Sequence, residues 1–150
     1  MSNTYTQLYI HIVFSVRHRD KMISPELKEH LYKYISGILS EKKHKLYIIN
    51  GISDHIHMLI GMRADCNLSV LVKEIKGSSS LHINKNRLTP NEFHWQTGYG
   101  AFSVSTSQKD KVIHYIENQK THHEHTTFED EFMKLLEAHG IEYDKKYVFD

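Results

Sequence analysis

Two histidines, His55 and His57, lie two residues apart in a segment where they alternate with apolar side chains. Successive side chains of a strand point to opposite faces, so the pair would stand on one face and Ile56, Met58 and Ile60 on the other. Imidazoles side by side can bind a divalent metal. Such pairs also occur as structural residues, so a metal site needs a third ligand and a reactive group elsewhere in the chain.

A helix predicted over residues 108–121 supplies candidates for both. Tyr115 and Gln119 lie one turn apart on it, within about 40° of one another. The amide oxygen of Gln119 could join His55 and His57 around a metal that keeps positions open for a phosphodiester. Metal charge would ease deprotonation of Tyr115, which could then act as a nucleophile. Mid-helix tyrosines more often serve packing, so this hypothesis requires all four residues to meet.

The surrounding pattern predicts an α/β (α+β) domain with a ferredoxin-like antiparallel sheet. Its order is strand, helix, strand, strand, helix, strand, with the helices on one face and the other face open. The expected strands cover residues 5–16, 45–52, 54–60 and 101–105, and the expected helices cover residues 25–42, 68–83, 108–121 and 128–138.

Local signals set the ends of these helices. Ser24, before a proline, and Asn67 are expected N-caps. Ser107 with Asp110 has the spacing of a capping box, and Gly140 follows the last helix as its stop. The tail, residues 141–150, is expected to pack back onto the domain or onto a second subunit.

The 150 residues fit one domain, 1–150, with an ordinary hydrophobic fraction of 39%. No apolar run is long enough to span a membrane, and the N-terminal residues lack the pattern of a secretory signal. The expected location is cytoplasmic. A single cysteine, Cys66, excludes an internal disulfide and a thiolate zinc site.

Charge is distributed unevenly along the chain. Residues 1–90 hold 13 lysines and arginines against 7 acidic residues, whereas residues 91–150 hold 6 against 11. Such asymmetry allows one surface to attract phosphate while the molecule stays nearly neutral, although solvated charge is the commoner explanation of any one cluster. The candidate nucleic-acid contacts are Arg17, Arg19, Lys73, Lys76, Lys85 and Arg87.

His122, His123 and His125 form a further histidine cluster beyond the tyrosine helix. Their crowded spacing at a helix end favours solvated side chains over a defined ligand set.

Three segments carry a resemblance to a known family: His55-Ile56-His57, then Gly98 to Ser105, then Tyr115-Ile116-Glu117-Asn118-Gln119. In this order they resemble the HUH single-tyrosine transposases of the smallest bacterial insertion sequences and their REP-associated relatives. The resemblance covers nearly the whole chain, to Tyr143.

The resemblance implies a metal-dependent enzyme that cuts and rejoins single-stranded DNA next to hairpins through a 5′-phosphotyrosine. By matching positions, His55, His57 and Gln119 are expected metal ligands and Tyr115 the expected nucleophile. The family uses Mg²⁺ or Mn²⁺, and two imidazoles favour Mn²⁺. It acts as a homodimer in which the tyrosine helix can complete the partner's site. Neither a membrane nor a small-molecule substrate is expected.

Two alternatives stay open. A replication initiator or relaxase-like nickase shares the chemistry but usually carries further domains, for which 150 residues leave no room. A domesticated protein could bind hairpin DNA without cutting it. The tyrosine helix could serve its own subunit or that of its partner.

Overall fold

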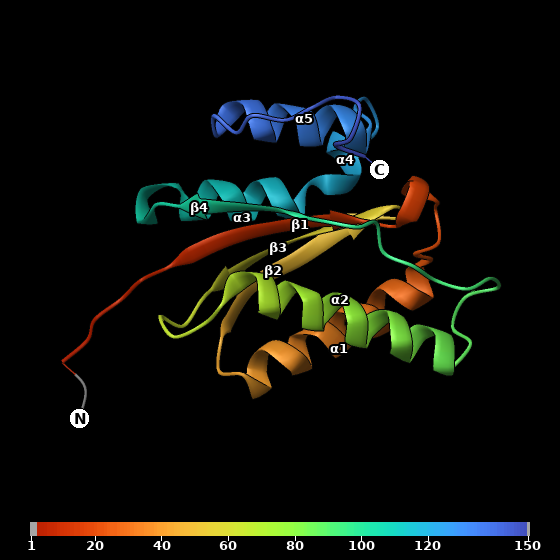
Figure 1. Cartoon of the computed structure of the whole chain (residues 1–150), viewed down its shortest axis with the longest axis horizontal. Coiled ribbons are helices and arrows are strands. Elements are labelled where there is room, and N and C mark those ends of the chain that lie inside the picture. The colour runs from red at the N-terminus through yellow and green to blue at the C-terminus, as the bar shows by residue number, and fades with distance from the viewer. Residues whose placement is uncertain (1–2, 150) are drawn as a thin grey trace.

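A four-stranded antiparallel sheet in the order β2-β3-β1-β4 runs through the middle of the molecule (Figure 1). The computed structural model describes residues 3–149; Met1, Ser2 and Asp150 lie outside the described residues. The element order confirms the predicted ferredoxin-like class. The elements are β1 (Tyr9–Ser15), η1 (Arg17–Arg19), α1 (Pro25–Glu41), β2 (Lys45–Ile52), β3 (His55–Gly61), α2 (Leu68–Lys85), β4 (Gly100–Val104), η2 (Thr106–Gln108), α3 (Lys109–Glu117), α4 (Gln119–His122) and α5 (Phe128–Ala138).

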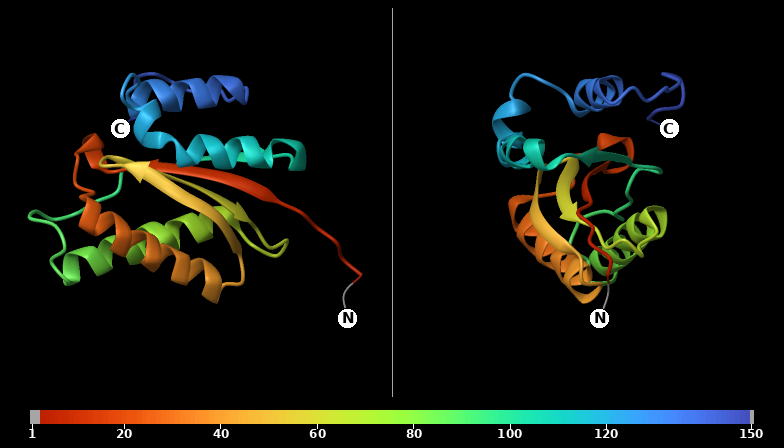
Figure 2. Two further views of the ribbon diagram at one scale, coloured as in Figure 1. Left: turned by 180° about the vertical axis from the view of Figure 1, so that it is seen from behind. Right: turned by 90° about the vertical axis from the view of Figure 1, so that its left-hand side faces the viewer.

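Helices α1 and α2 cover one face of the sheet and enclose the main core (Figure 2). The apolar side of β3, including Ile56 and Met58, packs there against residues such as Leu31 and Ile75. As expected, the side chain of Ser24 accepts a hydrogen bond from the Leu27 amide at the start of α1. Asn67 caps α2 in the same way. The predicted packing helices are therefore confirmed.

The other face of the sheet is not open, which corrects the prediction. Helices α3, α4 and α5 lie over it (Figures 1 and 2). A second apolar cluster forms between this face and α5, and it contains Val13, Phe102, Phe128 and Leu136. Because α5 has its own apolar side, it is stabilised by covering the face that carries the histidines.

The first strand is shorter than predicted. It begins at Tyr9 instead of Tyr5, because Tyr9 pairs with Gly61, the last residue of β3, and with Val104, the last residue of β4. Leu8 still accepts a backbone hydrogen bond from Met62 at 2.8 Å, but residues 3–8 are not part of a strand, so apolar character alone does not extend it.

The predicted tyrosine helix is divided in two. Asn118 has φ −96° and ψ 24°, and it separates α3, which carries Tyr115, from α4, which starts at Gln119. The expected Ser107 cap is also wrong. That residue lies within η2, and its hydroxyl is 3.0 Å from the hydroxyl of Ser105.

The C-terminal tail packs back onto the domain, as one of the two expected alternatives. Gly140, at φ +66°, ends the α5 segment, and the left-handed conformation suits glycine. Tyr143, Val148 and Phe149 then contact the cluster beneath α5, which includes Phe128. The tail thus holds α5 against the sheet.

Candidate active site

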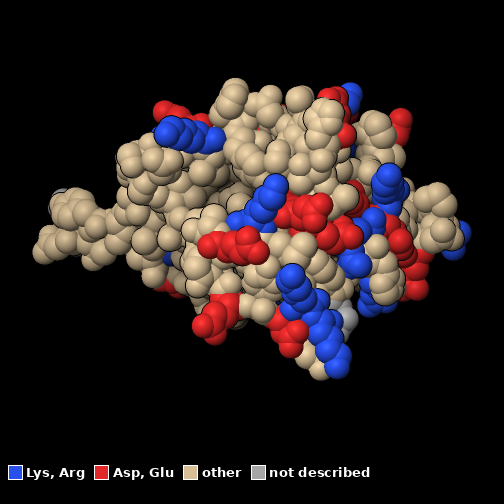
Figure 3. All heavy atoms as spheres, turned by 90° about the horizontal axis from the view of Figure 1, so that it is seen from above, with Lys and Arg blue, Asp and Glu red and all other residues tan. Residues whose placement is uncertain are grey.

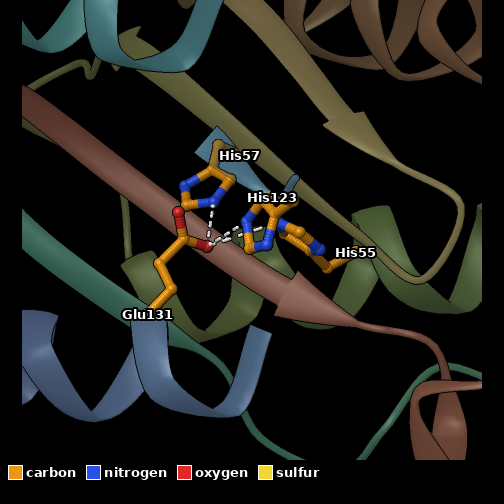
Figure 4. Close-up of side chains that lie close together, drawn as sticks. All are labelled: His55, His57, His123 and Glu131. Carbon is orange, nitrogen blue, oxygen red and sulfur yellow. Dashed lines mark hydrogen bonds and ion pairs between the residues drawn. The ribbon is translucent and has the colours of Figure 1, made fainter. Parts of the chain in front are cut away.

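The histidine pair of β3 lies at the centre of the face covered by the C-terminal helices. Both His55 and His57 are fully buried, and their rings point away from the core side of the sheet, as predicted (Figure 4). Nδ1 of His55 donates a hydrogen bond to Oδ1 of Asp54 at 2.7 Å. Nδ1 of His57 lies 2.8 Å from Nε2 of the buried His11 on β1. Each ring therefore presents Nε2 to a common centre.

Gln119 reaches this centre from α4. Its side chain is fully buried, and Oε1 lies 3.0 Å from Nε2 of His55. Gln119 therefore lies next to the histidines, as predicted. The continuous helix that was expected to carry both Tyr115 and Gln119 does not exist. The turn at Asn118 sets the position of Gln119 relative to Tyr115.

Glu131, on α5, was not anticipated from the sequence, yet it fills the middle of the site. Its Oε1 lies 2.9 Å from Nε2 of His57 and 3.3 Å from Nε2 of His55. Its Oε2 accepts a hydrogen bond from Nε2 of Gln119 at 3.1 Å. A signal for it exists in the sequence, because Glu131 falls one turn after Phe128, within the apolar stripe of an amphipathic helix.

His123 corrects the prediction that the downstream histidines are solvated. Its side chain is 2% exposed, and Nε2 lies 3.1 Å from Oε1 of Glu131. Nδ1 of His123 donates to the carbonyl oxygen of Thr126 at 2.6 Å. Of the other two members of that cluster, His122 is half-buried with Nε2 3.4 Å from Oε2 of Glu131, and only His125 is exposed as expected. The fold of α4 onto the sheet thus buries His123 almost completely and His122 in part.

Tyr115 lies beside the same centre. Its hydroxyl donates a short hydrogen bond to Oε2 of Glu131, and its ring centroid is 5.7 Å from that of His57. Burial and the negative charge of Glu131 raise the pKa of Tyr115 well above its usual range. The phenol is therefore neutral in this arrangement and donates its proton in a hydrogen bond to a carboxylate.

The buried groups set one another's charge. Burial lowers the pKa of His57 to about 4. Burial also acts to lower the pKa of His55, but hydrogen bonds to Asp54 and Glu131 outweigh it and raise that pKa to about 9. For Glu131 burial favours the neutral form, yet hydrogen bonds from His123, His55 and His57 hold its pKa far below the usual range. These buried groups thus include an ionised carboxylate, Glu131, and a charged imidazole, His55.

The candidate basic contacts divide into two groups. Lys76 and Arg19 are bonded to oxygens of the protein, whereas the other four are exposed. Lys73 and Lys76 line a groove of about 420 Å³ beside the segment 94–99. Lys76 points inward, where Nζ donates to the carbonyl oxygens of Gln96 and Gly98 at 2.6 Å each, and burial lowers its pKa to about 8.

Arg19 is held in a similar way. Its guanidinium donates to Oε1 of Gln96 at 3.2 Å and to the carbonyl oxygen of Phe149 at 3.0 Å. Arg17, Lys85 and Arg87 are exposed, with Lys85 about two and a half turns beyond Lys76 along α2. The face above α5 shows basic and acidic side chains interleaved, without a continuous basic band (Figure 3).

No helix within residues 3–149 is long and apolar enough to cross a membrane.

Comparison with known proteins shows which family the chain resembles. The family model described as "Transposase IS200 like" matches residues 4–119. The ISDra2 transposase TnpA of Deinococcus radiodurans is 23% identical over 119 residues, which cover 75% of this chain and 84% of the relative. The match of the family model ends at Gln119, so His123 and Glu131 lie beyond it.

Two solved structures share the fold. A putative transposase from Deinococcus radiodurans superposes with a TM-score of 0.65 and 21% identity, covering 79% of this chain and 95% of the other. A REP-associated tyrosine transposase bound to a REP hairpin gives a TM-score of 0.64 and 14% identity, covering 82% of this chain and 73% of the other. At these identities the two likenesses show the architecture alone.

Proposed function

Because the chain belongs to the family of IS200-like transposases, we propose that it cleaves and rejoins single-stranded DNA at hairpin-flanked ends, as one catalytic domain, with a divalent metal and a tyrosine nucleophile. The observation that supports this most is the meeting of four side chains in one buried site: His55, His57, Gln119 and Tyr115.

The donor set fits a divalent metal. His55 and His57 turn Nε2 toward one point, where Gln119 adds an amide oxygen, and the Nδ1 contacts with Asp54 and His11 fix the two rings. These residues would hold Mn²⁺ or Mg²⁺, with Mn²⁺ favoured by the imidazoles. The metal would supply Lewis-acid stabilisation of charge on the scissile phosphate.

Tyr115 provides the covalent step. Its hydroxyl lies at the edge of the site and gives up its proton as the phenolic oxygen attacks phosphorus. A bond forms between that oxygen and the 5′ phosphate, the bond from phosphorus to the 3′ oxygen breaks, and the leaving oxygen takes a proton. Rejoining reverses the step, with a 3′-hydroxyl attacking the phosphotyrosine.

The proposed DNA partner is a single strand that carries hairpins. A relative of the same fold was solved with a REP hairpin, which supports hairpin recognition here. Of the candidate contacts, Arg17, Lys73, Lys85 and Arg87 remain exposed for phosphate. A homodimer is part of the proposal, although within one chain Tyr115 already reaches its own histidines.

The test uses a pool of labelled single strands, each with a hairpin stem and randomised flanks, incubated with the protein and Mn²⁺. The proposal expects covalent protein–DNA adducts with the wild type and none with Tyr115→Phe. Tyr147→Phe, a change at an exposed tail tyrosine, is the matched control. Adducts with Tyr115→Phe would show that another group is the nucleophile. Hairpin binding without any adduct would instead favour the non-cutting DNA-binding alternative.

A further inference from the structure

The C-terminal segment beyond the family match contributes two side chains to the centre of the site. His123 follows α4 and Glu131 lies on α5, and both are packed against the histidines of β3 (Figure 4). The sequence shared with the family stops at Gln119, so these two groups are not part of what the family match covers.

Three imidazoles surround a single oxygen atom. Nε2 of His57, His123 and His55 lie 2.9, 3.1 and 3.3 Å from Oε1 of Glu131. An ordinary buried ion pair needs only one histidine for one carboxylate. Here three histidines point their Nε2 atoms at the same carboxylate oxygen. Such convergence is typical of metal ligands.

The second ring nitrogen, Nδ1, of each of the three histidines also has a partner in the protein. Nδ1 of His55 donates to Asp54, Nδ1 of His57 lies against His11, and Nδ1 of His123 donates to the carbonyl of Thr126. Metal-binding histidines characteristically engage their second ring nitrogen with a carboxylate, carbonyl or other group, which leaves the first nitrogen as the ligand. His123 is therefore oriented like the two histidines of the β3 pair, with Nδ1 bonded to the protein and Nε2 facing the centre of the site.

We propose that His123 and Glu131 complete the metal site formed by His55, His57 and Gln119, and that the enlarged donor set selects a first-row transition metal over Mg²⁺. The ligand atoms of the three histidines and Glu131 lie within 4.8 Å of one another, close to the separation across one ion bound at about 2.1 Å. Gln119 would add a fifth ligand, and a metal that accepts six ligands would still be able to bind a phosphate oxygen.

The preference for a transition metal follows from the ligand types. Mg²⁺ favours oxygen ligands and retains several waters, whereas Mn²⁺, Co²⁺ and Zn²⁺ accept imidazole nitrogen readily. Three imidazoles in a buried site leave little room for retained water. The Glu131 carboxylate adds a negative charge that offsets the charge of the cation in a site shielded from solvent.

The inference rests on the proposed metal site and is tested by metal binding, separately from DNA cleavage. Calorimetric titration of Mn²⁺ and Mg²⁺ compares the wild type with His123→Asn and Glu131→Gln. The matched controls are His125→Asn and Glu124→Gln, at exposed positions in the same segment. We expect at least tenfold weaker Mn²⁺ binding for the two site variants, unchanged binding for the controls, and a wild type that prefers Mn²⁺ to Mg²⁺ by at least tenfold.

A fourth variant, His57→Asn, separates this inference from the proposed function. If His57→Asn lost Mn²⁺ while His123→Asn and Glu131→Gln kept it, the enlarged site would be wrong and the proposed metal pair would stand. If the wild type bound no divalent metal, both would fail.

Wild-type protein provides a measurement that does not depend on the folding of variants. Nitrogen NMR of ¹⁵N-histidine-labelled protein with Zn²⁺ counts the imidazoles whose Nε2 signal moves on coordination. The proposed site requires three such histidines, His55, His57 and His123. Only two coordinated histidines would overturn it.

Discussion

The side chain of Asn50 on β2 donates hydrogen bonds from Nδ2 to the carbonyl oxygens of Ile116 and Glu117, at 2.9 and 3.1 Å. These carbonyls belong to the last turn of α3, where the helix breaks at Asn118 and its own amides no longer reach them. Asn50 therefore anchors the break that separates Tyr115 from Gln119, and it does so within one chain.

Replacing Asn50 by alanine should loosen this break. Loss of two hydrogen bonds costs about 1–3 kcal/mol, which corresponds to a decrease in Tm of roughly 2–10 °C for a domain of this size. Mn²⁺ affinity should fall as well, because Gln119 would no longer be held in place. Thermal denaturation and calorimetry measure the two effects. Asn91→Ala, in an exposed loop, is the control. A lower Tm with unchanged Mn²⁺ affinity would show that the anchor does not position Gln119.

The stability of the metal-free protein should depend on pH through His11. Burial and the charge of His57 lower the pKa of His11 to about 3, and burial lowers that of His57 to about 4, against 6.5 in the unfolded chain. A base with a lowered pKa in the folded state destabilises that state as pH falls below the unfolded pKa. The free energy of unfolding should therefore decrease between pH 6.5 and 5, by up to about 1.4 kcal/mol per pH unit for each histidine.

Neither His55 nor Glu131, two other strongly shifted groups of the site, cancels this trend. The raised pKa of His55 contributes stability that is already fully present below pH 6.5. The stability from the depressed pKa of Glu131 is lost only below its ordinary value of 4.5. Urea denaturation in EDTA at several pH values measures the slope. His11→Gln, which cannot ionise, should reduce it, and an equal slope in that variant would count against the role of His11.

The sequence predicted the histidine pair and its faces because strand alternation is a local property. His55 and His57 needed only their neighbours to be assigned to one side of a sheet. Gln119 was paired with Tyr115 through a continuous helix that does not exist; the two still meet because the turn at Asn118 is anchored from β2. That anchor is a contact between residues 66 positions apart, which no local pattern reveals.

His123 and Glu131 were missed for a related reason. His123 was assigned to solvent because it follows a helix end in a polar segment, and only the return of α5 over the sheet buries it. Glu131 could have been noticed as an acid within the apolar stripe that includes Phe128 and Leu135. Its partners, however, are supplied by β3, and the sequence did not place α5 on that face.

The two groove lysines should behave differently when they are replaced by methionine. Lys76→Met removes an ammonium that bonds the carbonyls of Gln96 and Gly98, so Tm should fall by several degrees. Lys73→Met changes an exposed side chain and should leave Tm unaltered while weakening DNA binding. The salt dependence of its affinity for a single strand should decrease by about 0.7 in log–log slope, the effect of one lost phosphate contact. Equal Tm values for both variants would contradict the structural role of Lys76.

Gly51 should tolerate no side chain, because the hairpin that presents His55 closes against it. A Cβ at Gly51 would lie 2.1 Å from the carbonyl oxygen of His55 and 2.8 Å from Cα of Ile56, and both atoms belong to the backbone of β3. Since neither can move without separating the strands, Gly51→Ala should lower the free energy of unfolding by about 3 kcal/mol or more and weaken Mn²⁺ binding. Gly37→Ala is the matched control: nothing lies within 4 Å of its added Cβ in α1, and the change should stabilise the protein by about 0.5–1 kcal/mol. Urea denaturation ranks the two variants, and wild-type stability for Gly51→Ala would mean that the hairpin can open at this point without displacing the site.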